Sequence, residues 1–164
     1  MTTYRYCTPE WLVESAKIYR SSPEFQETLK KVTTKICFLV TADTDWGIDD
    51  DIIFGAVVEK GVLIELDFFS RVTAEEMAEF IISATPQEWK LILRKDNKFI
   101  TDFMLGKIQL EQGSKVGIIG IAPYAPAFVD ALTQVELIFP DELAAQELEE
   151  YRSYLAKFRA ERGL

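Results

Sequence analysis

The strongest constraint on the fold of this chain is a change of hydrophobic period near residue 106. Before it, Phe99 and Phe103 recur at the spacing of an α-helix. After it, Ile108 and Leu110 alternate with polar residues, as in a half-buried strand. Gly106 stands at the switch, where the left-handed conformation that often ends a helix favours glycine. A helix is therefore predicted to turn directly into a strand here.

Three earlier segments have the pattern of β-strands. Residues 35–42 form an apolar run rich in β-branched side chains, which is typical of a buried strand. Ile52–Glu59 and Val62–Phe69 flank Lys60-Gly61, a signal for a tight hairpin. The second of these strands alternates apolar and acidic residues, which fits an antiparallel sheet with one covered face.

Residues 73–84 carry two conflicting signals. Thr73 and Glu76 have the spacing of a capping box, which begins a helix. Phe80-Ile81-Ile82 instead favours a strand, because β-branched and aromatic side chains are enriched in sheets. The pattern alone leaves both structures open.

Helix-start signals occur at several prolines. Thr8-Pro9 and Ser22-Pro23 each combine an N-cap residue with a proline in the first turn, which predicts two helices within residues 8–32. Pro86 opens a further helix. Residues 114–132 are apolar with helical spacing, and their prolines predict two helices in place of one.

A long helix is predicted over residues 141–162. Its apolar side chains are spaced three or four apart and form one stripe: Leu148, Tyr151, Leu155 and Phe158. Such a stripe packs either on its own domain or on a second copy of the chain, and the sequence leaves both open.

Composition excludes several classes of function. The 164 residues indicate a single domain, and 18 basic against 27 acidic residues give a net charge of −9. This balance disfavours nucleic acid as a partner, and it disfavours docking on anionic membranes except through a local basic patch. The chain has no histidine, so histidine-based catalysis and histidine-containing metal sites are excluded. We therefore expect no enzyme activity, no cofactor and no metal site.

The cysteines and the lack of long apolar runs indicate the cellular compartment. Cys7 and Cys37 do not form a disulfide framework. No apolar run resembles a signal peptide or reaches the length of about 20 residues that crosses a bilayer. We expect a soluble protein of the cytoplasm, without stable membrane insertion.

Two charged clusters are candidate binding sites. The acidic loop of residues 43–51 offers oxygen ligands for a hard cation, but it lacks the order of an EF-hand, which favours a solvated loop. Arg94, Lys95 and Lys98 form a basic turn. This turn is either an ordinary charged turn or a contact for the carboxylate or phosphate of an anionic head group.

The run Phe103, Gly106, Lys107 and Gly113, preceded by Trp89 on an apolar helix, resembles a motif of the sterol carrier protein 2 family. The order of the elements on both sides of the run also fits that family.

The resemblance covers about residues 35–135 and implies an α+β fold. A five-stranded, mainly antiparallel sheet would be covered by helices, and residues 77–84 would form one of its strands. The N-terminal helices within 8–32 and the long C-terminal helix over 141–162 would be additions to a single domain that spans residues 1–164.

The resemblance also implies a function. Domains of this family enclose an apolar tunnel between sheet and helices that takes lipid tails. This implies non-catalytic binding, and transfer, of a fatty acid, fatty acyl-CoA or other lipid in a cavity on the order of several hundred Å³. The predicted lining consists of Phe38, Val40, Ile64, Leu66, Phe68, Phe80, Ile82, Trp89, Ile92, Phe103, Met104, Ile118, Ile119 and Phe128.

Without the resemblance, the same side chains would be interpreted as an ordinary hydrophobic core. Two other functions then stay open. One is a protein-interaction module, with or without dimerisation, that binds its partner through the C-terminal helix. The other is an accessory domain of a lipid-metabolising enzyme.

Overall fold

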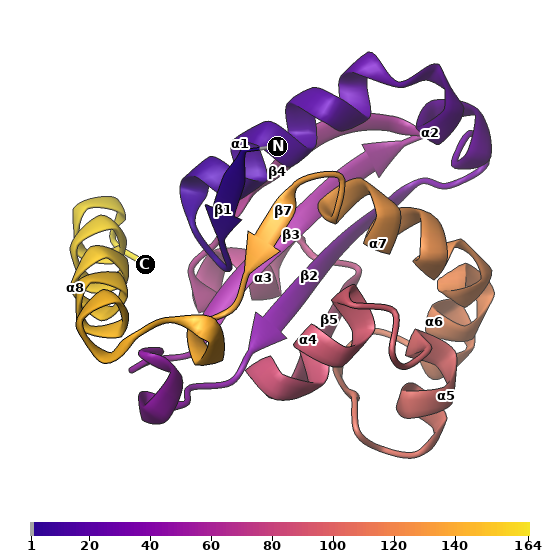
Figure 1. The fold of residues 1–164 in the computed structure, drawn as a ribbon. Helices are drawn as coiled ribbons and strands as arrows, with labels where there is room; N and C mark the ends of the chain where they lie inside the picture. The colour runs from indigo at the N-terminus through magenta and orange to yellow at the C-terminus, as the bar shows by residue number, and fades with distance from the viewer. Residues whose placement is uncertain (1) are drawn as a thin grey trace.

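A computed structural model describes residues 2–164 (Figure 1). Its main sheet has five strands in the order β4-β3-β2-β5-β6. The strands are β2 (Thr34–Val40), β3 (Ile52–Glu59), β4 (Val62–Phe68), β5 (Phe80–Ala84) and β6 (Gln109–Gln112). Only β2 and β5 run parallel, and the other neighbours are antiparallel. The predicted five-stranded, mainly antiparallel sheet is confirmed.

The helices account for most of the remaining chain. They are α1 (Pro9–Ser21), α2 (Pro23–Thr28), α3 (Arg71–Met77), α4 (Pro86–Leu93), α5 (Phe99–Met104), α6 (Lys115–Ile121), α7 (Ala125–Leu132) and α8 (Ala145–Arg162). Three short 3₁₀ turns are η1 (Thr44–Trp46), η2 (Ala122–Tyr124) and η3 (Pro140–Glu142). The sequence did not predict a small parallel sheet of β1 (Thr3–Arg5) and β7 (Glu136–Ile138), because three-residue strands carry no periodic signal.

Two predicted turns have the expected backbone. Lys60 and Gly61 both have positive φ, 49° and 81°, as the hairpin turn between β3 and β4 requires. Gly106 has φ 80° and ends α5 in the left-handed conformation. The change from helix to strand at this glycine is confirmed, although β6 begins at Gln109.

The two faces of the main sheet are covered unequally. Ile36 and Val40 on β2 belong to the larger core, which α1, α4 and α7 cover in Figure 1. Cys37 and Leu39 point to the opposite face, where they pack in a smaller cluster with Ala74 of α3. The larger apolar core therefore lies on the α1–α4–α7 side.

Residues 73–84 contain both a helix and a strand, but Thr73 and Glu76 do not form the predicted capping box, because α3 begins before Thr73. Ser70 caps α3 by accepting a hydrogen bond from the Thr73 amide at 3.2 Å, and the helix ends at Met77. The strand β5 then begins at Phe80, three residues later than predicted.

A β-bulge changes which side chains of β4 face the core. Val57 pairs with Glu65 and Val58 pairs with Leu63, so Ile64 has no partner in the ladder. The extra residue reverses the alternation, as bulges do. Leu63 is therefore buried, and Ile64 is 53% exposed. The prediction that Ile64 faces the covered side is wrong.

The helix α8 packs on its own chain. Tyr151 is buried and donates a hydrogen bond to the carbonyl of Tyr6 at 2.5 Å, while Leu155 and Phe158 are also buried. In Figure 1, α8 stands at the opposite end of the molecule from α5 and α6. Packing within the chain accounts for its apolar stripe.

Arginines of α8 hold the acidic loop of residues 43–51. Arg152 pairs with Asp49, and Arg159 donates to the carbonyl of Asp51 at 2.5 Å. The loop predicted to be solvated is therefore clamped against the C-terminal helix. Within residues 2–164, no group of three or more cysteine, aspartate or glutamate side chains is placed to hold a metal ion.

One helical run, Lys115–Leu132, has the length and hydropathy of a membrane-crossing helix, and 22% of it is buried in the fold. In the structure this run is divided into α6, η2 and α7, with Pro123 in η2 and Pro126 in the first turn of α7. The predicted division into two helices is confirmed.

Candidate functional site

An apolar cavity of about 60 Å³ lies between the main sheet and the helices α4 to α7. The sheet contributes Ile36, Phe38, Phe54 and Ile82. The helical wall consists of Trp89, Ile92, Leu93, Phe99, Ile118, Ile121, Ala122, Ala125, Phe128, Val129 and Leu132, and Tyr6 closes one end. Almost every group that faces this space is a hydrocarbon, so the cavity suits an alkyl chain.

A groove of about 510 Å³ adjoins the cavity, between the α4–α5 turn and α7. Five side chains line both spaces: Ile92, Phe99, Ala122, Ala125 and Val129. The groove adds polar groups at its outer edge, among them Lys95, Lys98 and Asp130. The site therefore changes from a charged mouth to an apolar interior.

A third space of about 30 Å³ lies deeper, between α1, α7 and the sheet. Phe38, Phe128 and Leu132 line both this inner void and the cavity, and so form the partition between them. The enclosed spaces are smaller than the predicted cavity of roughly several hundred Å³. The open groove beside them reaches that size.

Hydrogen bonding and ring contacts hold the wall of the cavity in place. The indole N–H of Trp89 donates to the carbonyl of Leu39 at 3.0 Å, across a buried interface. The Phe38 ring meets the Trp89 ring edge-on at 5.9 Å and lies 5.3 Å from the Phe54 ring. Thr85 begins α4 by accepting a hydrogen bond from the Glu88 amide at 3.1 Å. These contacts orient α4 so that its apolar side faces the sheet.

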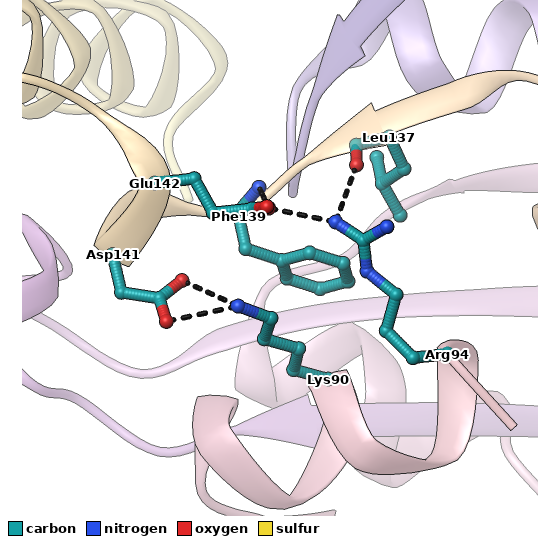
Figure 2. A network of polar contacts seen from close by, with 6 residues as sticks. All are labelled: Lys90, Arg94, Leu137, Phe139, Asp141 and Glu142. Carbon is teal, nitrogen blue, oxygen red and sulfur yellow. Dashed lines mark hydrogen bonds and ion pairs between the residues drawn. The ribbon is translucent and has the colours of Figure 1, made fainter. Parts of the chain in front are cut away.

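The outer side of α4 is anchored by the polar network in Figure 2. Lys90 Nζ lies 2.9 Å from both carboxylate oxygens of Asp141, and Arg94 lies 2.7 Å from Glu142. Both cations also lie over the Phe139 ring. Burial alone raises the pKa of Glu142, but the Phe139 N–H and the charge of Arg94 outweigh burial and lower it. The network ties η3 to the helix that lines the cavity.

The three basic residues predicted for a head group are divided by the fold. Arg94 donates to the carbonyl of Leu137 at 3.2 Å and belongs to the network of Figure 2, away from the groove. Lys95 and Lys98 line the groove. Lys95 pairs with Asp130 at 2.6 Å, and both side chains remain well exposed. Of the three basic residues, Lys95 and Lys98 therefore line the groove and Arg94 does not.

A buried pair of carboxyl groups joins α4 to α5. Glu88 is 7% exposed and Asp102 is 3% exposed. Burial, together with the hydrogen bond and charge of Asp102, raises the pKa of Glu88 to about 7. The hydrogen bonds from Glu88 and Asn97 lower the pKa of Asp102, although burial opposes them. Of the two carboxyl groups, Glu88 is therefore the one that holds a proton more readily.

Sequence reasoning missed this carboxyl pair. Both acids lie on helices where a solvent-facing position is the ordinary expectation. Nothing in their spacing indicates that α4 and α5 meet.

The structure places the fourteen predicted lining residues in four environments. Cavity lining is formed by Phe38, Ile82, Trp89, Ile92, Ile118 and Phe128. The inner void is lined by Leu66 as well as by Phe38 and Phe128. Core positions outside these spaces are occupied by Val40, Phe68, Phe80 and Phe103. Exposed positions are occupied by Ile64, Met104 and Ile119.

Helical geometry explains two of the exposed residues. Successive residues of an α-helix are about 100° apart, so Ile119 points outward when Ile118 points into the cavity. Met104 lies at the end of α5, whose inner side is already occupied by Phe99 and Phe103. The prediction that Met104 and Ile119 line an apolar tunnel is wrong.

Part of the missed lining did carry a signal. Ala125, Val129 and Leu132 were missed, although together with the predicted Phe128 they have the i, i+3, i+4, i+7 spacing of one helix face, and all four line the cavity. Tyr6 carried none, because it reaches the cavity only through the tertiary packing of β1.

No protein-family model matches the sequence, and no curated protein matches it. Solved structures match in fold. One is a conserved hypothetical protein of Thermus thermophilus, described as a possible sterol carrier protein. It has a TM-score of 0.70 and 17% identity over 80% of this chain and 90% of the other.

Two structures of sterol carrier protein 2 also match. One crystal structure has a TM-score of 0.64 and 19% identity, over 78% of this chain and 97% of the other. The apo form from Yarrowia lipolytica has a TM-score of 0.52 and 10% identity, over 76% and 88% of the two chains. At these identities the likeness is one of fold, and the chain has the fold of sterol carrier protein 2.

Proposed function

We propose that the protein binds a hydrophobic ligand with a long alkyl chain, such as a fatty acid, fatty acyl-CoA or other lipid, without catalysing a reaction. The observation that carries this proposal is that the lysine-bearing groove adjoins the apolar cavity and shares five lining side chains with it. The chain of the ligand would occupy the cavity, and its anionic end would lie beside Lys95 and Lys98.

The driving force is the removal of the alkyl chain from water, about 0.8 kcal/mol for each methylene group buried. The cavity of about 60 Å³ holds only the end of such a chain. The rest would lie in the groove, or would displace Phe128 from the partition. No hydrogen bond holds the Phe128 side chain, so its movement breaks only apolar contacts.

The comparisons support this proposal through the fold, since the matched structures carry the name sterol carrier protein. The alternative of an interaction module loses its main support, because Tyr151, Leu155 and Phe158 of α8 are already buried within the chain. The ligand carrier is therefore the function that the site supports best, and transfer of that ligand between membranes or enzymes would follow from its release through the groove.

The test is a titration with a fluorescent fatty acid, followed by competition with oleate. Ala125 lines both cavity and groove, so Ala125→Trp fills their junction and should weaken binding at least about ten-fold, as lost burial of two or more methylene groups does. Ala156→Trp on the exposed side of α8 is the matched control and should bind as the wild type does.

Native mass spectrometry of the purified protein would reveal a co-purified lipid and support the same conclusion. The proposal is wrong if wild-type protein shows no saturable binding at micromolar fatty acid. It is also wrong if Ala125→Trp, with an unchanged circular dichroism spectrum, binds as tightly as the control.

A further inference from the structure

The segment from Val116 to Val129 contains no charged residue, although 27% of the chain is charged. A surface helix normally presents a polar side to water. Here the outward side of α6 consists of Val116, Ile119 and Gly120, and Val116 is 82% exposed. An apolar helix face of this kind, left in water, marks an interaction surface.

The neighbouring helix α5 adds to the same surface. Ile100, Met104 and Leu105 are all exposed. Phe99 of α5 and Ile118 of α6 line the same cavity, and Figure 1 shows both helices at one end of the molecule. The groove lies between α5 and the η2–α7 segment, since Ile100 lines one side of it and Pro123 the other. We call Ile100, Met104, Leu105, Val116, Ile119 and Pro123 the apolar rim.

The charge around the apolar rim is opposite to that of the whole chain. Residues 90–129 contain six basic and three acidic residues. The rest of the chain contains twelve basic and twenty-four acidic residues. Lys98 directly precedes α5, Lys107 follows it and Lys115 begins α6. All three are exposed, and within residues 2–164 none of them has a carboxylate within 4.0 Å.

We propose that the apolar rim docks the protein on the surface of a lipid bilayer with anionic head groups. The rim side chains would enter the boundary between head groups and acyl chains, and the lysines would lie at the level of the phosphates. The groove would then open toward the bilayer. The docking proposal is based on the apolar rim and its lysines alone. The idea that docking serves to load a lipid depends on the function proposed above.

The structure favours docking on the surface over crossing of the membrane. The apolar run of residues 115–132 is divided at η2, and Ile118, Ala122 and Leu132 within it belong to the folded core. A spanning helix would have to remove these side chains from the core. A bilayer surface also fits better than a second copy of the chain, because a symmetric dimer through the rim would bring like-charged lysines together.

The experiment is flotation of ligand-free protein with vesicles of phosphatidylcholine alone or mixed with phosphatidylglycerol. Each lysine near an anionic surface contributes about five-fold in partitioning, so removing two should cost about 25-fold. Lys98→Gln with Lys115→Gln is the charge variant, and Lys17→Gln with Lys157→Gln is its control. Binding of the wild type should also fall at high salt, because salt screens the attraction.

A second pair of variants tests the apolar contribution. Val116→Glu in the rim should lower partitioning at least about ten-fold, since a charged side chain does not enter the acyl boundary. Val13→Glu on α1 is the control, because Val13 is 67% exposed and lies outside the rim. Both positions are on the surface, so both variants should melt as the wild type does.

Flotation of the wild type with anionic vesicles, lost in the rim variants and kept in both controls, would support docking. No flotation of the wild type at low salt would overturn it, as would equal losses in rim variants and controls. A wild-type dimer that Val116→Glu converts to a monomer, without any flotation, would show that the rim joins two copies. Fatty-acid titration without vesicles tests the proposed function separately, because flotation without fatty-acid binding would refute only that function.

Discussion

The buried pair of Glu88 and Asp102 makes stability depend on pH in a defined window. The pKa of Glu88 is about 7 in the folded protein, against an ordinary value of 4.5. Because the folded state keeps a proton that the unfolded chain has lost, the stabilising contribution is full below about pH 4.5 and is lost as pH rises toward 7. At about 1.4 kcal/mol for each pKa unit, the loss is about 3 kcal/mol.

Other shifted carboxyl groups act outside this window. The pKa values of Asp102 and Glu142 are lowered, so their stabilisation is present above their ordinary pKa values of 3.8 and 4.5 and is lost only as pH falls through the lower, folded values. The charge of Lys107 opposes the rise in the pKa of Glu88. The slope between pH 5 and 7 therefore reports Glu88.

The assay is thermal unfolding between about pH 5 and 7.5. About 2.5 kcal/mol of the loss falls in this range, which lowers the melting temperature of a chain of this size by about 5–10 °C. Glu88→Gln keeps a hydrogen-bond donor for Asp102 and cannot ionise, so its melting temperature should be almost constant across this range. Glu150→Gln, on the exposed side of α8, should keep the wild-type slope. A flat wild-type profile, or the same slope in Glu88→Gln, would refute the assignment of the proton to Glu88.

Three further predictions concern the cavity, a turn and the terminal helix. Phe128→Ala should join the cavity to the inner void, cost about 3 kcal/mol in stability and admit a bulkier ligand, which melting and competition with branched fatty acids would show. Gly106→Val should cost about 1–3 kcal/mol in chemical denaturation because φ is 80° there, whereas Gly120→Val, at a position without positive φ, should cost less; equal costs would contradict the argument. Truncation before Asp141 should unfold the chain or lower its melting temperature sharply, because α8 buries three large side chains; a fully stable truncated protein would show that this packing contributes little.

Part of the candidate site was predicted from the sequence. The correct assignments depend on local patterns, and the wrong ones depend on contacts between separate segments. Trp89 and Ile92 were assigned to an apolar wall because their helix is amphipathic, and they line the cavity. Ile64 was misplaced because a bulge depends on the pairing of two strands and leaves no mark on either strand alone. Arg94 was misplaced because its partner, Glu142, comes from a segment that follows it by 48 residues.

The sequence by itself determined the elements whose signals are local. The positive φ of Gly106, the hairpin at Lys60-Gly61 and the apolar stripe of α8 all follow from residue types within a few positions of one another. Hydrophobic periodicity predicts which side chains are buried, but it does not predict which residues they pack against. Only the tertiary structure decided that α8 packs against the acidic loop, that Glu88 meets Asp102, and that the partition at Phe128 divides the apolar space, because these contacts join segments whose approach depends on the packing of the whole chain.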